Sequence, residues 1–267
     1  IQFRNFSLKL YHFIIILKMF DYEQEKERLF RVQREMQSRI NNTQHLNNYR
    51  YVGGADLTDR DGMIVGCFVV VDCQNNLKVI YQKCTEMKVN VPYFAGLLCF
   101  REGPVVVSLY REFQQKCPNI KLDVIICDGS GEWHTRGLGL ASYVGVQLQI
   151  PTIGVFKNFL YIGSEHNKDD VIYNAQKTCK NIGDYIVMNH TLRNGVNVRC
   201  AVMKTMRKHY FNPIYISPGN LIDFNSSIEI VKRLCIDREP EPVRLADRIS
   251  RKYIQNKTNK FHYTPDN

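Results

Sequence analysis

The sequence contains no C-x-x-C pair, no internal repeat and no low-complexity segment. Because cysteine pairs at zinc-ligand spacing are missing, we do not expect a structural zinc site. The nine cysteines are an odd number, and several lie inside apolar, strand-like runs: Cys67, Cys73, Cys127 and Cys200. Cysteines in such runs usually behave as small buried hydrophobic residues. The pattern therefore favours free thiols in a reducing, intracellular compartment over a disulfide framework.

A membrane-spanning run is also missing. The mostly apolar segment Leu10–Phe20 has eleven residues, whereas a transmembrane helix needs about 20. It has the length of a signal-peptide core, but no small-residue cleavage site follows and Asp21 begins a charged stretch. Since the chain starts at Ile1 and Met19 offers a natural start, we interpret residues 1–18 as a leader outside the folded core. We expect no membrane partner.

Positive charge is what the sequence has in excess. Its 267 residues carry a formal net charge of +10, with a pI near 9.1. The basic residues are spread through the sequence rather than set on one amphipathic helix, which favours nucleic acid over a membrane surface as the partner. A chain that is 44% hydrophobic at this length can bury one sizeable core. We predict one domain, residues 19–256, followed by a polar basic tail, residues 257–267.

The first part of the chain predicts a helix and three strands. From Tyr22 to Ile40, apolar residues recur at helical spacing between charges. Three strand-like runs follow, Tyr51–Leu57, Met63–Val71 and Leu77–Tyr81, and turn-rich segments separate them. Such connections predict an antiparallel meander.

Helices and strands then alternate. An apolar helical face extends from Leu97 to Phe113, and a strand is predicted at Leu122–Cys127, a helix at Gly137–Gln149 and a strand at Thr152–Phe156. A strand–helix–strand unit with a right-handed crossover pairs its strands in parallel. This order is expected of a ribonuclease H-like α/β fold. Its mixed central sheet combines an antiparallel three-strand meander with parallel strands and is flanked by helices.

The pattern beyond Lys157 is weaker. Val198–Met203 and Pro213–Ser217 have the composition of strands. The segment Ser217-Pro218-Gly219-Asn220 predicts the start of a helix that continues to Leu234, and Arg244–Gln255 predicts the last helix.

A dense group of reactive side chains follows the strand Leu122–Cys127. Asp128, His134 and Arg136 place a carboxylate, an imidazole and a guanidinium in one loop. Four glycines among the eleven residues from 129 to 139 let the backbone pass close to a bound group. Open α/β sheets bind ligands in loops that leave the carboxyl ends of their strands. The segment therefore predicts a functional site.

Two more acidic residues belong to this prediction. Asp56 lies on the first strand and Glu102 on the helix after Pro92. Alone, Asp56 would be interpreted as a turn or capping residue and Glu102 as a solvated helix charge. In a ribonuclease H-like sheet the first and fourth strands are neighbours, which brings Asp56 beside Asp128. A divalent cation removes the repulsion between such carboxylates, and this oxygen-rich ligand set suits magnesium or manganese rather than zinc.

Five motifs, in this order, resemble the Endonuclease V family. They are Gly53-Gly54-Ala55-Asp56; Pro92 to Glu102; Asp128-Gly129-Ser130-Gly131 with His134 and Arg136-Gly137; Ile153-Gly154-Val155-Phe156-Lys157; and Pro240 to Asp247. The resemblance runs from about Tyr22 to Tyr253 and is greatest to the animal members. Any one motif would be weak, but five in sequence with family-like spacing are specific.

The resemblance implies a metal-dependent nuclease that recognises inosine, the product of adenine deamination. The family hydrolyses the second phosphodiester bond on the 3′ side of the inosine and leaves 3′-hydroxyl and 5′-phosphate ends. By motif position, Asp56, Glu102 and Asp128 would be metal ligands. Asp247 would be a further ligand, unless it caps the last helix or pairs with an arginine. The metal would be Mg²⁺, with Mn²⁺ able to substitute.

Two basic side chains complete the catalytic group that the resemblance implies. His134 would lie within reach of the phosphate or of the attacking water, unless its loop simply exposes it. Lys157 matches the family's active-site lysine and would neutralise developing charge on the phosphoryl oxygens. Its alternative is an ordinary surface lysine.

The stretch Pro92-Tyr93-Phe94-Ala95 matches the family's wedge. Proline stiffens the turn, and the Tyr93 ring would fill the gap left when a base leaves the stack. The alternative for Tyr93 is a core aromatic residue before a helix. Ala95 replaces the second wedge residue of bacterial members, which leaves the substrate preference open.

An inosine pocket built mainly from backbone needs glycines around it. Gly96, Gly129, Gly131 and Gly139 hold the matching positions, and Leu98 is assigned to the same substrate site. Backbone amides and carbonyls can distinguish the hypoxanthine edge from that of adenine at N1 and O6.

The choice between RNA and DNA stays open in the sequence. Animal-like members favour inosine in single-stranded RNA and bacterial relatives are regarded as DNA repair enzymes, so the resemblance favours RNA. A protein that binds inosine-containing RNA without cleaving it is the alternative function on the same fold. We expect a monomer in the cytoplasm or the nucleus, including the nucleolus. Basic residues near the C-terminus would add sequence-independent affinity or form a solvated helix face: Arg248, Arg251, Lys252, Lys257 and Lys260.

Overall fold

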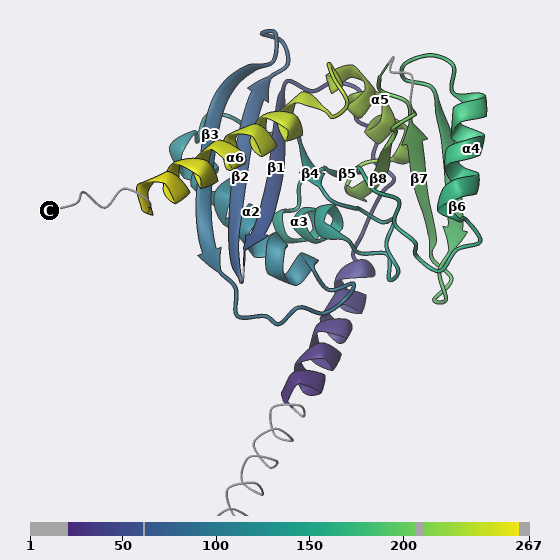
Figure 1. Ribbon diagram of the computed structural model, residues 1–267, viewed down its shortest axis with the longest axis horizontal. Helices are drawn as coiled ribbons and strands as arrows, with labels where there is room; N and C mark the ends of the chain where they lie inside the picture. The colour runs from purple at the N-terminus through teal and green to yellow at the C-terminus, as the bar shows by residue number, and fades with distance from the viewer. Residues whose placement is uncertain (1–20, 61, 207–210, 262–267) are drawn as a thin grey trace, which may run out of the picture.

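The computed structural model describes residues 21–60, 62–206 and 211–261, with side chains described as far as Lys257. Its centre is one eight-stranded sheet with the order β3-β2-β1-β4-β5-β8-β7-β6 (Figure 1). The strands are β1 (Tyr51–Arg60), β2 (Met63–Asp72), β3 (Lys78–Lys88), β4 (Val124–Asp128), β5 (Thr152–Phe156), β6 (Tyr185–Thr191), β7 (Asn197–Met203) and β8 (Ile214–Asn220). The helices are α2 (Cys99–Lys116), α3 (Leu140–Leu148), α4 (Lys168–Thr178), α5 (Phe224–Leu234) and α6 (Glu241–Phe261), and residues 21–37 are also helical.

The first three strands form the predicted antiparallel meander. β1 pairs with β2 and β2 with β3, both in antiparallel register. β4 pairs in parallel with β1 on one side and with β5 on the other. In the β1–β4 register Ala55 lies opposite Cys127. The next residues, Asp56 within β1 and Asp128 at the end of β4, therefore lie side by side on neighbouring strands. The predicted mixed α/β sheet is confirmed.

Alternation along the strands divides the main core into two layers. Val52 and Cys67 pack in the layer that contains α5 and α6, whereas Ala55 and Phe68 pack against α2 and α3. Successive strand residues point to opposite faces, so Asp56 shares the face of Val52. In Figure 1, α6 crosses in front of β1, β2 and β3 on that face. The fold thereby brings the last helix over the strand that carries Asp56.

The second part of the sheet was predicted only in part: the predicted strand Val198–Met203 lies within β7, and Pro213–Ser217 overlaps β8. β6 and α4 were not predicted, because β6 is a half-exposed edge strand and α4 buries only Val171 and Ala175 among its residues. The predicted helix start at residues 217–220 was wrong. These residues belong to the buried strand β8, which pairs with β5. The helix begins at Phe224, after Asp223 accepts a hydrogen bond from the Ser226 amide at 2.8 Å.

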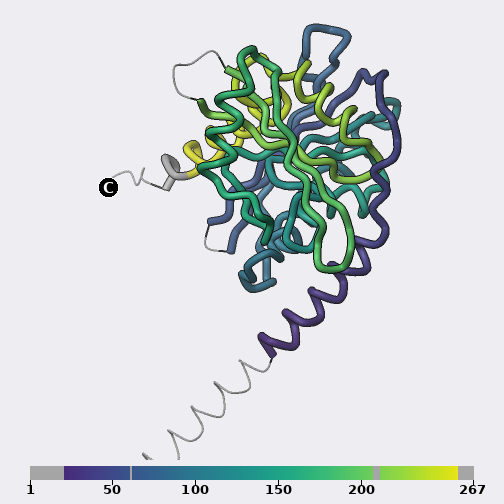
Figure 2. Tube along the Cα trace, turned by 90° about the vertical axis from the view of Figure 1, so that its right-hand side faces the viewer, coloured from purple at the N-terminus to yellow at the C-terminus, as the bar shows by residue number. Residues whose placement is uncertain are grey.

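The N-terminal helix projects from the body of the molecule, as Figure 2 shows. Its buried residues Leu29 and Met36 pack with Phe94 and Leu97 in a small separate cluster. Through this contact the helix supports the segment that precedes α2. The predicted leader, residues 1–18, lies outside the described residues.

The last helix is longer than predicted. α6 continues to Phe261 rather than ending at Gln255, so it includes the first residues of the predicted basic tail. Residues 262–267 lie outside the described part of the chain. Within that part, no helix combines the length and apolar character needed to cross a bilayer. All nine cysteines are free thiols, as expected.

Candidate active site

Asp56 and Asp128 form the centre of the candidate site. Asp56 is only 5% exposed, and its Oδ2 accepts a hydrogen bond from Ser250 Oγ at 2.9 Å. Ser250 is fully buried on α6 and lies three residues after Asp247, which is about one helical turn. The helix therefore presents Ser250 and Asp247 together to the strand that carries Asp56.

Four carboxylates share one electrostatic environment. The pKa of Asp56 is raised to about 7 by burial and by the charges of Asp128 and Asp247, although the hydrogen bond from Ser250 lowers it. Burial also raises the pKa of Glu102 to about 7, with contributions from Asp128 and Asp56. These groups come from β1, α2, β4 and α6, so the fold has collected them from distant parts of the chain. Two of the four are costly to ionise where they lie.

Lys157 lies directly after β5 and between two carboxylates. Its Nζ is 2.9 Å from Asp128 Oδ2 and 3.3 Å from Glu239 Oε2. Burial alone would lower the pKa of Lys157, but the two carboxylates outweigh it and raise the pKa. The sequence did not single out Glu239, although it directly precedes the motif at Pro240. Lys157 therefore belongs to the carboxylate group as its cation.

The chemistry of these side chains fits a hard divalent cation. Carboxylate oxygens are the ligands that Mg²⁺ and Mn²⁺ prefer, and a nearby cation would offset the repulsion that raises the pKa values of Asp56 and Glu102. In the arrangement described, three of the carboxylates already have protein partners: Asp56 with Ser250, Asp128 with Lys157, and Asp247 with Arg251 at 2.8 Å. Accordingly, among the described residues, no three His, Cys, Asp or Glu side chains are grouped so that they could hold a metal ion. Some of these side chains would have to exchange partners to bind one.

His134 lies in the loop after β4, half-buried. Its Nδ1 accepts a hydrogen bond from the Arg136 amide at 3.3 Å. Burial, together with the Arg136 charge, lowers the pKa of His134 to about 3, so the imidazole is neutral at physiological pH. Arg136 Nη2 donates to the Gly96 carbonyl at 2.6 Å. Gly96 has φ +76°, a conformation that favours glycine, and a Cβ there would lie 2.4 Å from Arg136 Nη2.

The predicted wedge has one exposed ring and one buried ring. Tyr93 is 65% exposed, and Ala95 beside it is also exposed. Phe94 is buried, and its ring centroid lies 4.5 Å from that of Tyr22 on the N-terminal helix. Pro92 is half-buried, and Leu98 lies at the surface before α2. Tyr93 is thus the aromatic side chain of this stretch that is free to contact a ligand.

The remaining pocket glycines are packed against the protein itself. A Cβ at Gly131 would lie 2.0 Å from the Pro218 carbonyl oxygen, and one at Gly139 would lie 2.2 Å from Ser130 Oγ. The Gly129 amide donates to a carbonyl of β5 at 2.9 Å. These contacts explain why the loop requires glycines for its own fold. Their predicted role in binding a base remains a prediction.

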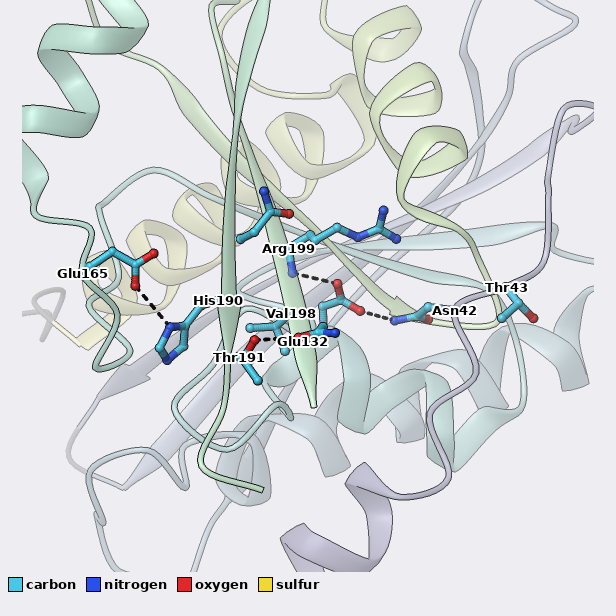
Figure 3. A pocket seen from close by; sticks show the side chains of 10 residues that line it. Asn42, Thr43, Glu132, Glu165, His190, Thr191, Val198 and Arg199 are labelled. Carbon is cyan, nitrogen blue, oxygen red and sulfur yellow. Dashed lines mark hydrogen bonds and ion pairs between the residues drawn. The ribbon is translucent and has the colours of Figure 1, made fainter. Parts of the chain in front are cut away.

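A separate polar cleft of about 880 Å³ adjoins the same loop (Figure 3). Its most buried acidic group is Glu132, four residues after Asp128. Glu132 Oε1 accepts from the Arg199 amide at 2.9 Å, and Oε2 accepts from Asn42 Nδ2 at 2.7 Å. The sequence did not single out Glu132. Its two hydrogen bonds hold the loop against β7 and against the connector that precedes β1.

Comparison with known proteins identifies relatives over most of the chain. A family model described as Endonuclease V matches residues 34–248. The chain is 34% identical over 229 residues to Endonuclease V of Dictyoglomus thermophilum, which covers 85% of this chain and 90% of that protein. It is 32% identical over 213 residues to Endonuclease V of Mus musculus, which covers 76% of this chain and 60% of that protein.

Solved structures agree with these relatives. The crystal structure of human ENDOV superposes with a TM-score of 0.78 at 24% identity, covering 87% of this chain and 99% of that one. Endonuclease V of Ciona intestinalis, in complex with a DNA containing an inosine followed by a ribo-adenosine, gives a TM-score of 0.77 at 28% identity, covering 88% and 99%. The ribonuclease H-like fold is confirmed. With the family model matching four fifths of its length, this chain belongs to the Endonuclease V family and is a nuclease that hydrolyses phosphodiester bonds.

Proposed function

We propose that this chain is a Mg²⁺-dependent endonuclease that cleaves inosine-containing single-stranded RNA, with Mn²⁺ able to replace Mg²⁺. The bond hydrolysed is the second phosphodiester on the 3′ side of the inosine, and the products carry 3′-hydroxyl and 5′-phosphate ends. Deoxyinosine in DNA is a secondary substrate. The observation that carries this proposal is the group of carboxylates that β1, α2, β4 and α6 bring together, with the buried Asp56 beside Ser250 and with Asp128 beside Lys157.

The carboxylates would hold the cation. Asp56, Glu102 and Asp128 are the proposed ligands, and Asp247 lies close enough to raise the pKa of Asp56. When bound, the cation polarises the scissile phosphate and lowers the pKa of the attacking water. The protein's part is to keep these oxygens on rigid elements, two strands and two helices, so that little reorganisation accompanies the reaction.

Lys157 would act on the phosphate rather than on the metal. Its raised pKa keeps the ammonium charged at physiological pH, and it lies beside Asp128. A fixed positive charge there would stabilise negative charge that develops on the phosphoryl oxygens. His134, neutral because its pKa is lowered to about 3, would contribute as a hydrogen-bonding group and not as a cation.

Recognition of inosine would use the exposed Tyr93 and the backbone of the glycine loops. The exposed ring is free to replace a base that has left the stack. Support comes from the Ciona intestinalis relatives, which were crystallised with a DNA that contains an inosine followed by a ribo-adenosine. A ribonucleotide on the 3′ side of the inosine lies next to the proposed cleavage site. This arrangement favours RNA over DNA as the substrate, and the net charge of +10 suits either polyanion.

Cleavage of matched oligonucleotides tests the proposal. Labelled single-stranded RNA and DNA, each with one inosine, would be incubated with the full chain in Mg²⁺ or in EDTA, beside Asp56→Ala and beside oligonucleotides with adenosine in place of inosine. We expect Mg²⁺-dependent cleavage one nucleotide beyond inosine, faster in RNA and lost in Asp56→Ala. Tight inosine-dependent binding without cleavage in Mg²⁺ or Mn²⁺ would contradict the nuclease mechanism. It would favour a protein that binds inosine-containing RNA without cleaving it. Faster cleavage of DNA would overturn the RNA preference alone.

A further inference from the structure

Glu239 is a charged, largely buried residue in the proposed site to which neither the motifs nor the mechanism assigns a role. Its side chain is 15% exposed, in the segment between α5 and α6. Its Oε2 lies 3.3 Å from Lys157 Nζ, while Asp128 Oδ2 lies 2.9 Å from the same nitrogen on the other side. Lys157 therefore has two carboxylate partners, and its ammonium lies within ion-pair distance of both.

The segment that holds Glu239 is fastened to the backbone of Lys157 itself. Arg238 Nη2 donates to the Lys157 carbonyl at 3.3 Å and to Asn212 Oδ1 at 2.6 Å. An isolated backbone β-bridge pairs Cys235 with Pro240, so the residues before and after Glu239 are held together. These contacts keep the Glu239 carboxylate at the end of β5. The backbone around Glu239 is therefore fixed by specific contacts, unlike that of a glutamate in a flexible surface segment.

A divalent cation bound to Asp128 would compete with the Lys157 ammonium for the negative charge of that carboxylate. An ammonium and a divalent cation at neighbouring positions repel each other strongly in a half-buried site. If the ammonium simply left Asp128, a charge with little access to water would lose its partner, which is costly. Glu239 offers the ammonium a second carboxylate at the distance of a small side-chain movement. No other described ion pair of Lys157 provides this alternative.

We propose that Glu239 is a positioning residue that receives the Lys157 ammonium when Asp128 turns to a divalent cation. The inference rests on the proposed metal-dependent function and adds to it a partner exchange within the chain. In the arrangement described, Lys157 neutralises Asp128. With the cation bound, Glu239 holds Lys157 at the edge of the site, where it faces the phosphate without competing for the metal ligand.

Metal binding to the full chain, without nucleic acid, tests the exchange. Mn²⁺ and Mg²⁺ binding would be measured by calorimetry for wild type, Glu239→Gln, Lys157→Met and the double variant. Glu239→Gln preserves the shape of the side chain and leaves Lys157 with Asp128 as its remaining carboxylate, so we expect about tenfold weaker metal binding. Lys157→Met removes the competitor and binds metal more tightly than wild type. In that background, Glu239→Gln should change the affinity by less than about twofold.

The double variant separates the exchange from a simple loss of negative charge. An equal weakening by Glu239→Gln with and without Lys157 would show a long-range charge effect and would overturn the proposal, as would no weakening in either background. Glu241→Gln is a matched control, because Glu241 pairs with Arg244 at 2.7 Å and not with Lys157. We expect it to bind metal as wild type does.

Two further readouts keep the test decisive. Glu239→Asp retains the charge and should bind metal more tightly than Glu239→Gln, whereas a purely steric role would leave Glu239→Gln near wild type and weaken Glu239→Asp. Wild-type cleavage of inosine-containing RNA is measured in parallel. If wild type binds metal and cleaves while the variant effects are additive, the exchange is wrong and the proposed function stands. If wild type binds no metal, the proposed function fails and the exchange fails with it.

Discussion

Asp56 is a single residue whose buried carboxylate lowers the stability of the fold when it is ionised. Its carboxylate is 5% exposed and lies near Asp128 and Asp247, so ionisation is unfavourable. A protein that only needed a stable core would place a neutral side chain there. Strained electrostatics of this kind concentrate at functional sites. The direct hydrogen bond from Ser250 offsets only part of the cost.

The pH dependence of metal binding follows from these shifts. Asp56 and Glu102 bind a cation in their ionised form, and each has a pKa near 7. Protons therefore compete with the metal below pH 7, and we expect Mg²⁺ affinity to rise with pH and to level off above about pH 7. Calorimetry at a series of pH values measures this directly. An affinity that is already constant between about pH 5 and 7 would show that these two groups are not ligands.

The same shift predicts that Asp56→Asn stabilises the protein. The folded-state pKa of Asp56, about 7, lies above the ordinary aspartate value of 3.8. The stability contributed by its protonated form is therefore fully present below pH 3.8 and is lost as pH rises through about 7. An asparagine never ionises, so metal-free Asp56→Asn should be more stable than wild type by about 2 kcal/mol at pH 8 and nearly equal to it at pH 4. Urea unfolding at both values checks this. A pH-independent difference would contradict the linkage.

At the scale of elements, the contact between α6 and β1 assembles the site. Gly54 lies two residues before Asp56, and a Cβ on it would lie 2.2 Å from the Pro242 carbonyl carbon. Gly54→Ala must therefore push back the start of the helix that carries Asp247 and Ser250. We expect a loss of about 2–3 kcal/mol in the free energy of unfolding together with weaker metal binding.

Gly163→Ala is the control for that substitution. Gly163 has open space around its Cβ position but φ +88°, so its cost of about 1 kcal/mol comes from the backbone alone. Urea unfolding and calorimetry on both variants make the comparison. If Gly54→Ala bound metal as tightly as Gly163→Ala, the helix contact would not govern the site.

The wedge gives a contrast between neighbouring rings. Tyr93 is exposed, so Tyr93→Ala should leave the melting temperature within about 2 °C of wild type while it slows cleavage of inosine-containing RNA. Phe94 is buried against Leu97 and contacts the ring of Tyr22, so Phe94→Ala should cost about 3–4 kcal/mol of stability. Thermal unfolding and single-turnover cleavage distinguish the two roles. Equal cleavage by Tyr93→Ala and wild type would remove Tyr93 from the substrate site.

The elements that the sequence predicted are those with strong local signals. The meander and the β4–α3–β5 unit have regular apolar patterns and clear turns, so their pairing could be predicted. The first half of β8 was predicted as Pro213–Ser217, but its second half was not, because Pro218 and Gly219 favour a turn locally and this part of the strand depends on its pairing with β5. Glu239 was missed for a similar reason. Its partner Lys157 is 82 residues away, and no spacing rule connects them.

The candidate site combines residues from both ends of the chain, Asp56 on β1 and Asp247 and Ser250 on α6. The proximity of Asp56 and Asp128 could be predicted from the sequence, because a ribonuclease H-like sheet places their strands side by side. Asp247 and Ser250 arrive by a different route, since the last helix crosses back over the first three strands (Figure 1). The sequence motif indicated Asp247, but only the folded chain shows which atom of α6 contacts Asp56. The family resemblance indicated the proposed ligands, and tertiary packing supplied their partners.

Net charge acts on the molecule as a whole, and α6 shows which charges are available to a polyanion. Lys257 forms an ion pair with Glu86 at 2.7 Å and Arg251 one with Asp247 at 2.8 Å, whereas Arg248 and Lys252 are exposed on the same helix. We expect binding of single-stranded RNA to weaken about 10- to 100-fold between about 50 and 200 mM salt. The double variant Arg248→Gln/Lys252→Gln should lower the slope of log affinity against log salt by about one.

Lys257→Gln is the matched control for this salt dependence. Its charge is already paired with Glu86 and is therefore less available to an RNA phosphate, so the slope should change less per charge removed than in the double variant. Fluorescence anisotropy in EDTA, with inosine-free RNA, isolates this sequence-independent part of binding from catalysis. An equal change in slope for Lys257→Gln and the double variant would mean that the RNA does not distinguish paired from unpaired charges on α6. An unchanged slope in both variants would show that the nucleic acid contacts another surface, and the surface around the exposed Tyr93 would be tested next.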